Sequence, residues 1–201
     1  MTAARSKPSK ARPADQAERI LEAALAMAER EGWGNLRLRK LAAELGLSLA
    51  ELQAHYRDAD AIADAWFRRG WAAMLAPAPE GFAELPAVER LETILLRWFD
   101  ALAPQRRVTG EMLAGKLYPS HPHHWVPTIF NLSRTIHWLR DAAGLDAGGR
   151  RRQLEEIGLT LLFLATLRDW VRDESPEQER TRAALRRRLR GGDRLMARLY
   201  P

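Results

Sequence analysis

Apolar residues recur at helical spacing along almost the whole chain. Between residues 15 and 31, one helical face carries Ile20, Leu21, Ala24, Leu25 and Ala28. Runs that alternate between apolar and polar residues with a period of two, which are typical of strands, do not occur. The pattern predicts an all-α fold.

Start and stop signals divide the first part of the chain into four helices. Asp15 and Glu18 form a capping box at the start of a helix over 15–31. Two shorter helices over 37–45 and 48–56 are joined by a tight turn at Gly46, which is typical of a helix-turn-helix unit. A fourth helix is predicted over 58–76.

A cluster of prolines and glycine over 77–86 predicts a domain junction, because these residues break helices. The predicted organisation is a basic arm over 1–13, a helix-turn-helix head over 14–57, a connecting helix over 58–76, the junction, a larger helical domain over 87–190 and a tail over 191–201. In the second domain we expect helices over 86–103, 105–117, 127–143, 149–173 and 176–190.

The predicted helix over 149–173 is apolar on two sides. One stripe consists of Leu154, Ile157, Leu161 and Leu164, and the other of Leu159, Leu162, Phe163 and Trp170. Either this is a central core helix, or its second apolar side meets a partner, and Gly158 would let another helix approach closely. We predict a homodimer with an interface that includes Leu154, Gly158, Leu159, Leu161 and Leu162.

The composition restricts the classes of protein. With 201 residues, 46% of them hydrophobic, the chain can bury a sizeable core. The absence of cysteine excludes disulfides, thiolate metal sites and cysteine nucleophiles. The longest near-apolar run, over 158–167, is too short to span a bilayer, and the N-terminus lacks the apolar region of a secretory signal. We expect a soluble protein of the cytoplasm.

The net charge of +6 is concentrated at the two ends of the sequence. Residues 1–13 carry four basic residues and no acidic one, and residues 176–201 carry eight arginines against three acidic residues. The body between them is mildly acidic. A basic balance usually indicates a polyanionic partner, and here that indication applies only to the ends.

The stretch from Asn35 to Ile62, preceded by a capped helix that ends in Glu31-Gly32-Trp33, resembles the TetR family of bacterial transcriptional regulators. Leu41-Ala42, Leu45-Gly46 and Leu52 match the family's core positions, and His55-Tyr56 matches its usual aromatic pair. The resemblance implies a three-helix DNA-binding head, a larger helical domain that binds a small molecule, and a dimer formed through the last two long helices.

The departures from the family pattern fall where DNA is usually contacted. Arg37 replaces the usual Thr or Ser, Ala50-Glu51 replaces Gly-Thr, Gln53 replaces a Tyr, and Ala59 replaces a Lys. Residues 14–57 hold six basic against seven acidic residues, so the head itself offers little non-specific affinity for DNA. The residues expected to contact an operator are Lys7, Lys10, Arg12, Arg37, Arg39, Ser48, Gln53, His55 and Tyr56.

A second resemblance covers residues 90–190. The motifs His123-His124-Trp-Val-Pro127, Ile136-His-Trp-Leu-Arg-Asp-Ala-Ala-Gly144 and Arg168-Asp-Trp-Val-Arg-Asp-Glu-Ser-Pro176 are similar to those of the lipid-binding accessory proteins of ubiquinone biosynthesis. Those proteins have a TetR-like fold, do not act as repressors and dock on membranes. Two functions therefore stay open: a regulator, expected to be a repressor, or a lipid-binding protein that meets an anionic membrane through residues 176–201.

Large apolar side chains are concentrated in the fourth helix and the second domain. The pocket predicted from them is lined by Trp66, Trp98, Phe99, Met112, Tyr118, Trp125, Trp138 and Phe163. The competing interpretation is that these side chains fill the core. Because the family layout implies a pocket, we expect a hydrophobic or isoprenoid-like small molecule as the ligand.

The sequence contains no Gly-x-Ser-x-Gly elbow, no phosphate-cradling glycine loop and no His-Glu-x-x-His motif, so neither catalysis nor a cofactor is predicted. His121, His123 and His124 suggest a metal site, but no carboxylate lies near them in the sequence. A solvated loop or a pocket lid is the preferred interpretation, and no metal is predicted.

Overall fold

The structure is a computed structural model that describes residues 13–116 and 125–200, and side chains from 125 to 130 are outside the description. The described residues form helices and connecting loops, as the all-α prediction requires. The chain divides into two compact units, residues 1–66 and 67–201. Their boundary falls inside α4 (Ala59–Met74), which therefore contributes residues to both units.

The first unit is built on α1 (Pro13–Glu31), with the 3-10 turn η1 (Trp33–Asn35), α2 (Leu38–Leu45) and α3 (Leu49–His55). The three α-helices pack on one another. Their core is the predicted apolar face of α1, together with Leu41 of α2 and Leu52 of α3. Gly46 ends α2 in the left-handed conformation (φ 67°), which lets the chain turn sharply into α3.

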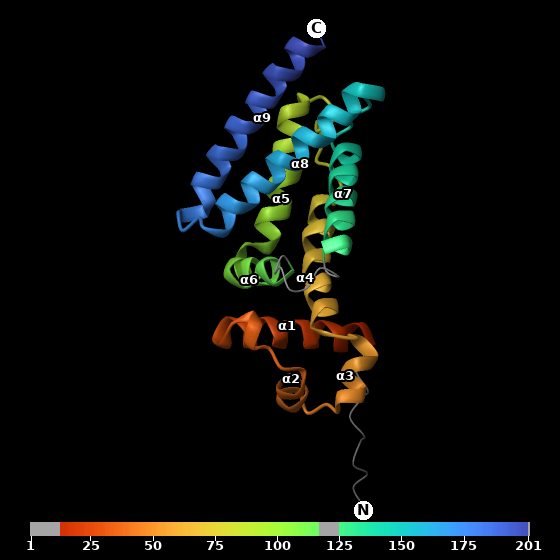
Figure 1. The fold of residues 1–201 in the computed structure, drawn as a ribbon, viewed down its shortest axis with the longest axis vertical. Coiled ribbons are helices and arrows are strands. Elements are labelled where there is room, and N and C mark those ends of the chain that lie inside the picture. The colour runs from red at the N-terminus through yellow and green to blue at the C-terminus, as the bar shows by residue number, and fades with distance from the viewer. Residues whose placement is uncertain (1–12, 117–124, 201) are drawn as a thin grey trace, which may run out of the picture. The chain divides into compact units, whose positions relative to one another are not determined.

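The second unit holds the end of α4, α5 (Ala87–Leu102), η2 (Ala103–Gln105), α6 (Arg106–Lys116), α7 (Trp125–Ala142), α8 (Gly149–Val171), η4 (Pro176–Gln178) and α9 (Glu179–Leu199). Helix α9 packs on both α5 and α8, and α7 packs on α5 and α8 (Figure 1). Rings of α5 and α8 meet at the centre, where Trp98 and Phe163 lie edge to face with centroids 5.2 Å apart.

Two predicted boundaries differ from the structure. The breaker-rich segment 77–86 ends α4 but does not separate the units, because both of its flanks belong to the second unit. Helix α9 was expected to stop at residue 190, yet it continues through Gly191 and Gly192 to Leu199. A glycine costs a helix only about 1 kcal/mol, which the arginine- and leucine-rich remainder of α9 can offset.

Helix α8 has the predicted two apolar sides. Leu159, Phe163 and Trp170 are buried in the core of the second unit. The exposed apolar stripe consists of Leu154, Ile157, Leu161 and Leu164. Leu159, which the sequence analysis assigned to the dimer interface, thus belongs to the core of its own unit, and Leu162 is half-buried.

The turn between α8 and α9 contains two non-glycine residues with positive φ, Glu177 (47°) and Gln178 (60°). Side-chain contacts hold this strained backbone in place. The Gln178 amide accepts a hydrogen bond from Trp170 Nε1 and donates one of 3.2 Å to Asp100 of α5. The turn is therefore fixed to the body of the second unit.

A buried arginine joins α7 to α8. Arg140 is 2% exposed and donates to the backbone oxygens of Leu145 and Ala147 and, at 2.9 Å, to the carboxylate of Glu155. A buried guanidinium requires such partners, since removing them would leave an uncompensated charge in the interior. The pairing fixes the C-terminal end of α7. None of the described helices is long and apolar enough to cross a bilayer.

Candidate DNA-binding surface and ligand cleft

Helix α3 has the start signals expected of a recognition helix. Ser48 is its N-cap: the backbone N–H of Glu51 donates to Ser48 Oγ at 3.2 Å, and the Glu51 carboxylate accepts from Ser48 N at 2.8 Å. These two hydrogen bonds form a capping box. The Glu51 carboxylate also accepts a hydrogen bond from the Ser48 hydroxyl. Glu51 therefore has a structural role at the helix start, which explains an acidic residue at this position.

The outer face of α3 is small and neutral. Its exposed side chains other than the capping glutamate are Leu49, Ala50, Gln53 and Ala54. Gln53, one of the predicted DNA contacts, lies on this face, and His55 is half-buried at the end of the helix. Tyr56 is only 7% exposed, and its hydroxyl donates to the backbone oxygen of Ala17 in α1 at 3.2 Å. The structure thus places Tyr56 in the core of the head rather than among the DNA contacts.

Most cations of the head already have partners. Arg30 pairs with Glu44, Lys40 with Glu31, and Arg57 with Asp58. Arg37, a predicted contact, donates to the backbone oxygens of Gly34 and Leu36.

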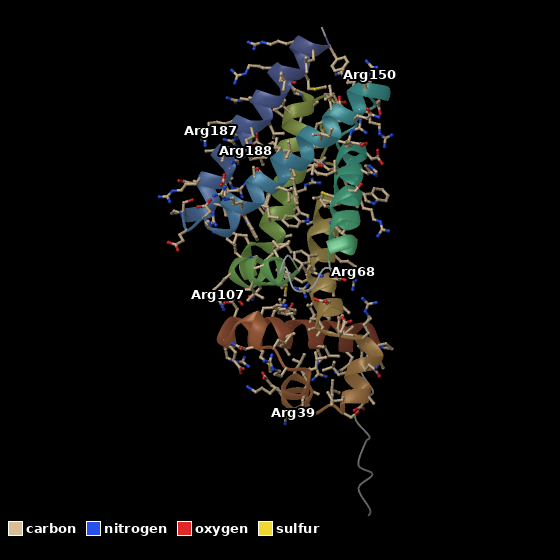
Figure 2. All side chains as sticks on the ribbon, viewed as in Figure 1. Arg39, Arg68, Arg107, Arg150, Arg187 and Arg188 are labelled. Carbon is tan, nitrogen blue, oxygen red and sulfur yellow. The ribbon has the colours of Figure 1, made fainter. Side chains whose placement is uncertain are left out.

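Arg39, labelled in Figure 2, is different. Its side chain is exposed, and the described residues give it neither an ion pair nor a hydrogen bond. Among the predicted contacts that the structure describes, Arg39 is the charged one without a hydrogen-bond or ion-pair partner. The predicted contacts of the arm, Lys7, Lys10 and Arg12, lie outside the described residues.

The predicted aromatic pocket is largely a packed core. Trp98 lies edge to face against Phe99 with ring centroids 5.2 Å apart, and Phe99 stacks on Phe163 at 6.0 Å. Trp66 and Met112 are buried as well. Rings that contact one another fill space rather than line it, so the core interpretation holds for these five residues. Tyr118 and the side chain of Trp125 lie outside the described residues.

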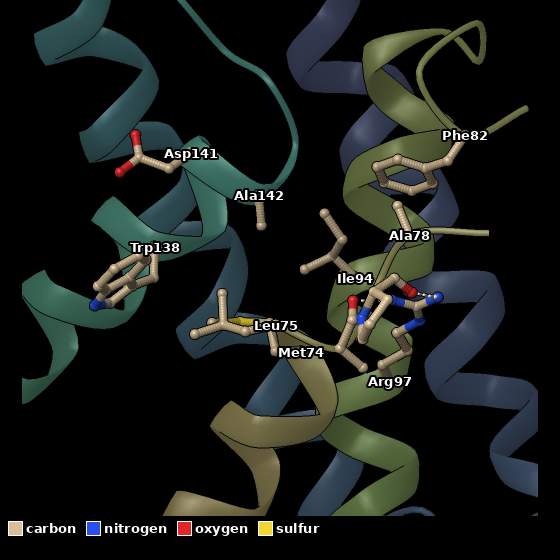
Figure 3. A pocket seen from close by; sticks show the side chains of 11 residues that line it. Met74, Leu75, Ala78, Phe82, Ile94, Arg97, Trp138, Asp141 and Ala142 are labelled. Atoms are coloured by element: carbon tan, nitrogen blue, oxygen red, sulfur yellow. Dashed lines mark hydrogen bonds between the residues drawn. The ribbon is translucent and has the colours of Figure 1, made fainter. Parts of the chain in front are cut away.

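An apolar cleft of about 430 Å³ opens elsewhere in the second unit, between the end of α4, the 77–86 segment, α5 and α7. Figure 3 shows its aliphatic centre around Leu75, Met74 and Ile94, with Phe82 on one side. Trp138, one of the predicted pocket residues, projects from α7 at the rim and is 56% exposed. We call this cavity the α4–α5–α7 cleft.

Two contacts fix the walls of the cleft. Arg97 of α5 donates to the backbone oxygens of Ala76 at 3.0 Å and Pro77 at 3.4 Å, which holds the chain just after α4. Trp71 Nε1 of α4 donates to Thr135 Oγ1 of α7 at 3.0 Å. The last turns of α4 are thus bonded to α7, and the segment that follows them is bonded to α5.

Comparison with solved structures finds this fold in other proteins. A TetR transcriptional regulator from Nitrosomonas europaea is 37% identical, with a TM-score of 0.79, over 89% of this chain and 98% of that chain. The chain belongs to the TetR family of transcriptional regulators. No family model and no curated protein matches the sequence.

Two further TetR structures support the fold alone. A regulator from Rhodococcus is 15% identical with a TM-score of 0.60, over 89% of this chain and 97% of that chain. One from Thermus thermophilus is 21% identical with a TM-score of 0.55, over 86% and 97%. All three are named as transcriptional regulators, so the comparisons do not favour the lipid-binding alternative.

In this TetR-family chain, sequence reasoning missed most of the cleft. Met74, Leu75 and Phe82 flank or lie within the breaker-rich segment, which was interpreted only as a junction. A phenylalanine among prolines and glycine was the available signal, because an apolar ring in such a loop needs a surface to cover. The histidines at 121, 123 and 124 lie outside the described residues, and no metal-binding group occurs among the residues that are described.

Proposed function

We propose that this TetR-family chain is a repressor that binds operator DNA through α3 and releases it when a hydrophobic small molecule occupies the α4–α5–α7 cleft. The observation that carries the DNA-binding part is the capped α3, whose exposed side chains other than the capping Glu51 are uncharged. A helix face on which most exposed side chains are uncharged can enter a major groove, where Gln53 can bond an adenine edge.

The charges of the head assign a supporting role to Arg39. Three other cations are compensated by acidic neighbours, Arg37 is bonded to backbone, and Arg19 donates to the side chain of Gln16, so Arg39 is the cation left to supply charge for a phosphate contact. We infer that Gln53 contributes specificity and that Arg39 contributes affinity that does not depend on sequence.

The test is binding to the DNA upstream of the chain's own coding sequence, measured by fluorescence anisotropy at low salt. Gln53→Ala should weaken binding to this DNA about tenfold and leave binding to random DNA unchanged, whereas Arg39→Gln should weaken both. Arg198→Gln, an exposed arginine of the second unit, is the matched control for charge. Absence of binding by the wild type would reject the repressor.

We further propose that the exposed apolar stripe of α8 forms the dimer interface. Leu161 is 64% exposed and Ile157 is 58% exposed. Monomeric proteins rarely expose a continuous apolar stripe, so this surface is expected to be covered by a partner. Nothing lies within 4 Å of the position that a Cβ of Gly158 would take, so a second helix can approach there. The stripe continues into a groove of about 470 Å³ beside α7, lined partly by Ile136 and Ile157.

Helix α4 supports a coupling between ligand and DNA. Its last turns line the cleft and are bonded to α7, and its first turns belong to the unit that contains α3. A ligand that shifts the end of α4 would bias the whole helix, since a continuous α-helix moves largely as a rigid element. By linkage, DNA must then weaken ligand binding by the same factor.

A filled cleft tests the ligand site. Ala142→Trp places an indole in the cleft, whereas Ala72→Trp adds one on the exposed side of α4 as a control. The fluorescence of the neutral apolar probe N-phenylnaphthylamine should rise with the wild type and the control but not with Ala142→Trp. Equal fluorescence with all three proteins would place the probe elsewhere. Operator affinity without ligand should be the same for the wild type and the control.

A further inference from the structure

We propose that a hollow between the end of α8 and the start of α9 binds the phosphate or diphosphate group of a small anionic molecule. The hollow has a volume of about 460 Å³, and the residues that line it include three arginines, Arg172, Arg180 and Arg187. We call it the arginine hollow. It is separate from both the DNA-binding surface and the α4–α5–α7 cleft.

The two carboxylates in the arginine hollow are already engaged. Asp173 is 5% exposed and accepts hydrogen bonds from Ser175 and Thr181. Asp169 pairs with Arg188 at 2.5 Å. Neither acid is within ion-pair distance of the three bordering arginines, and the described residues give those arginines no other side-chain partner. The hollow therefore carries an excess of positive charge.

Three other arginines of α9 each form an ion pair with a carboxylate of a neighbouring helix. Arg182 pairs with Asp100 at 2.6 Å, Arg186 with Glu92 at 2.5 Å, and Arg188 with Asp169. Figure 2 shows Arg187 next to Arg188 on α9. Of these two neighbours in sequence, Arg188 has an acidic partner and Arg187 borders the hollow without one.

Lack of a partner alone does not define a site, because Arg190 and Arg194 are also exposed and without an acidic partner among the described residues. What distinguishes Arg172, Arg180 and Arg187 is that all three line one hollow. Like charges held around a cavity repel one another, and a multivalent anion removes that repulsion.

The chemistry of the hollow favours a phosphate group. Guanidinium forks bond phosphate oxygens two at a time, and the volume suits a small molecule. The backbone N–H groups of Arg180 and Thr181 are taken by Ser175 Oγ and Asp173, so recognition depends on the side chains. Ala183 and Ala184 leave room beside them for a compact, strongly charged group.

The probe is inorganic pyrophosphate, titrated into the full chain by calorimetry in a low-salt chloride buffer. The wild type should bind it, and Arg180→Gln and Arg187→Gln should each weaken binding about tenfold or more, since a charge-assisted hydrogen bond is lost in each case. Arg190→Gln and Arg194→Gln remove the same charge from α9 outside the hollow and should change the Kd less than about twofold. Melting curves of the four variants should match the wild type, because all four side chains are exposed.

Two results would overturn the proposal. The first is that the wild type gives no binding heat with millimolar pyrophosphate. The second is that all four variants weaken binding equally, which would indicate diffuse attraction by a basic helix. A lipid phosphate is the other source of this chemistry, and flotation with phosphatidylcholine vesicles containing phosphatidic acid distinguishes it. Flotation that depends on Arg187 without pyrophosphate binding would replace the small molecule by a lipid headgroup.

Discussion

Four hydrogen bonds converge on the carboxylate of Asp173, from the backbone and side chains of Ser175 and Thr181. Burial opposes the ionised form, but these donors outweigh it and hold the pKa of Asp173 well below its usual range. The carboxylate ties the end of α8 to the first turn of α9. It therefore stabilises the turn that also carries the strained Glu177 and Gln178.

Asp173→Asn should lower the free energy of unfolding by about 1 to 3 kcal/mol at neutral pH, because one oxygen becomes an amide that cannot accept. The sign of the pH dependence follows from the lowered pKa. The unfolded chain binds a proton near pH 4 while the folded protein does not, so the contribution is complete above about pH 5 and is lost as the pH falls below about 4. Urea unfolding at pH 7, 5 and 3 should show a smaller acid loss for the variant; an equal loss would contradict the assignment.

Gly70 of α4 has no side chain, and this lets Trp98 and Leu102 of α5 pack closely against the helix. A Cβ at this position of α4 would lie 2.8 Å from Trp98 Nε1 and 3.2 Å from Leu102 Cδ1. Both side chains are buried, so neither can move freely. Gly70→Ala should destabilise the protein by about 1 to 3 kcal/mol in spite of the better helix propensity of alanine. The matched control is Gly191→Ala in α9, which meets nothing within 4 Å and should be neutral or stabilising; thermal melting measures both.

At the scale of elements, α8 carries the exposed apolar stripe for which we propose a second copy of the chain as the partner. Replacing Leu161 by Glu places a charge in the middle of the exposed apolar stripe, and two such charges would face each other across a symmetric interface. We expect Leu161→Glu to be a folded monomer at micromolar concentration, where sedimentation should show the wild type as a dimer. Folding should survive because the side chain does not contribute to the core of its own unit.

The control for this prediction is Leu49→Glu, since Leu49 of α3 is also a strongly exposed leucine, at 52%. It should leave the dimer intact. A wild type that sediments as a monomer would remove the α8 interface. A Leu161→Glu variant that remains a dimer would move the interface to another surface.

Periodicity predicted the helices well because each needs one buried face, and burial is encoded by residues three and four apart. It predicted the two sides of α8 for the same reason. It could not decide which large side chains pack together and which line a space. Trp98 and Phe163 pack on each other while Trp138 is exposed at a cleft, and that difference depends on how separate helices meet. The boundary inside α4 was missed because prolines mark the end of a helix, not the extent of a compact unit.

At the scale of the whole molecule, we expect the basic residues at the N-terminus to supply DNA affinity that a head with little net charge lacks. Residues 14–57 hold six basic and seven acidic residues, and three of those cations are paired with acids. Non-specific affinity for DNA comes mainly from neutralised phosphates. The four cations of residues 1–12, Arg5, Lys7, Lys10 and Arg12, are therefore the main source of charge that the sequence places next to the head.

Replacing these four cations by glutamine in the full-length chain should flatten the salt dependence of DNA binding. The slope of log K against log salt should fall by about 0.9 for each lost phosphate contact, up to about 3.6 if all four contribute. Glutamine keeps the length and polarity of the arm, so only charge changes. The control replaces Arg194 and Arg198, two cations of α9, and should leave the slope unchanged. An unaltered slope in the arm variant would mean that Arg39 and the backbone of the head supply the phosphate contacts, and the arm would then have no part in binding DNA.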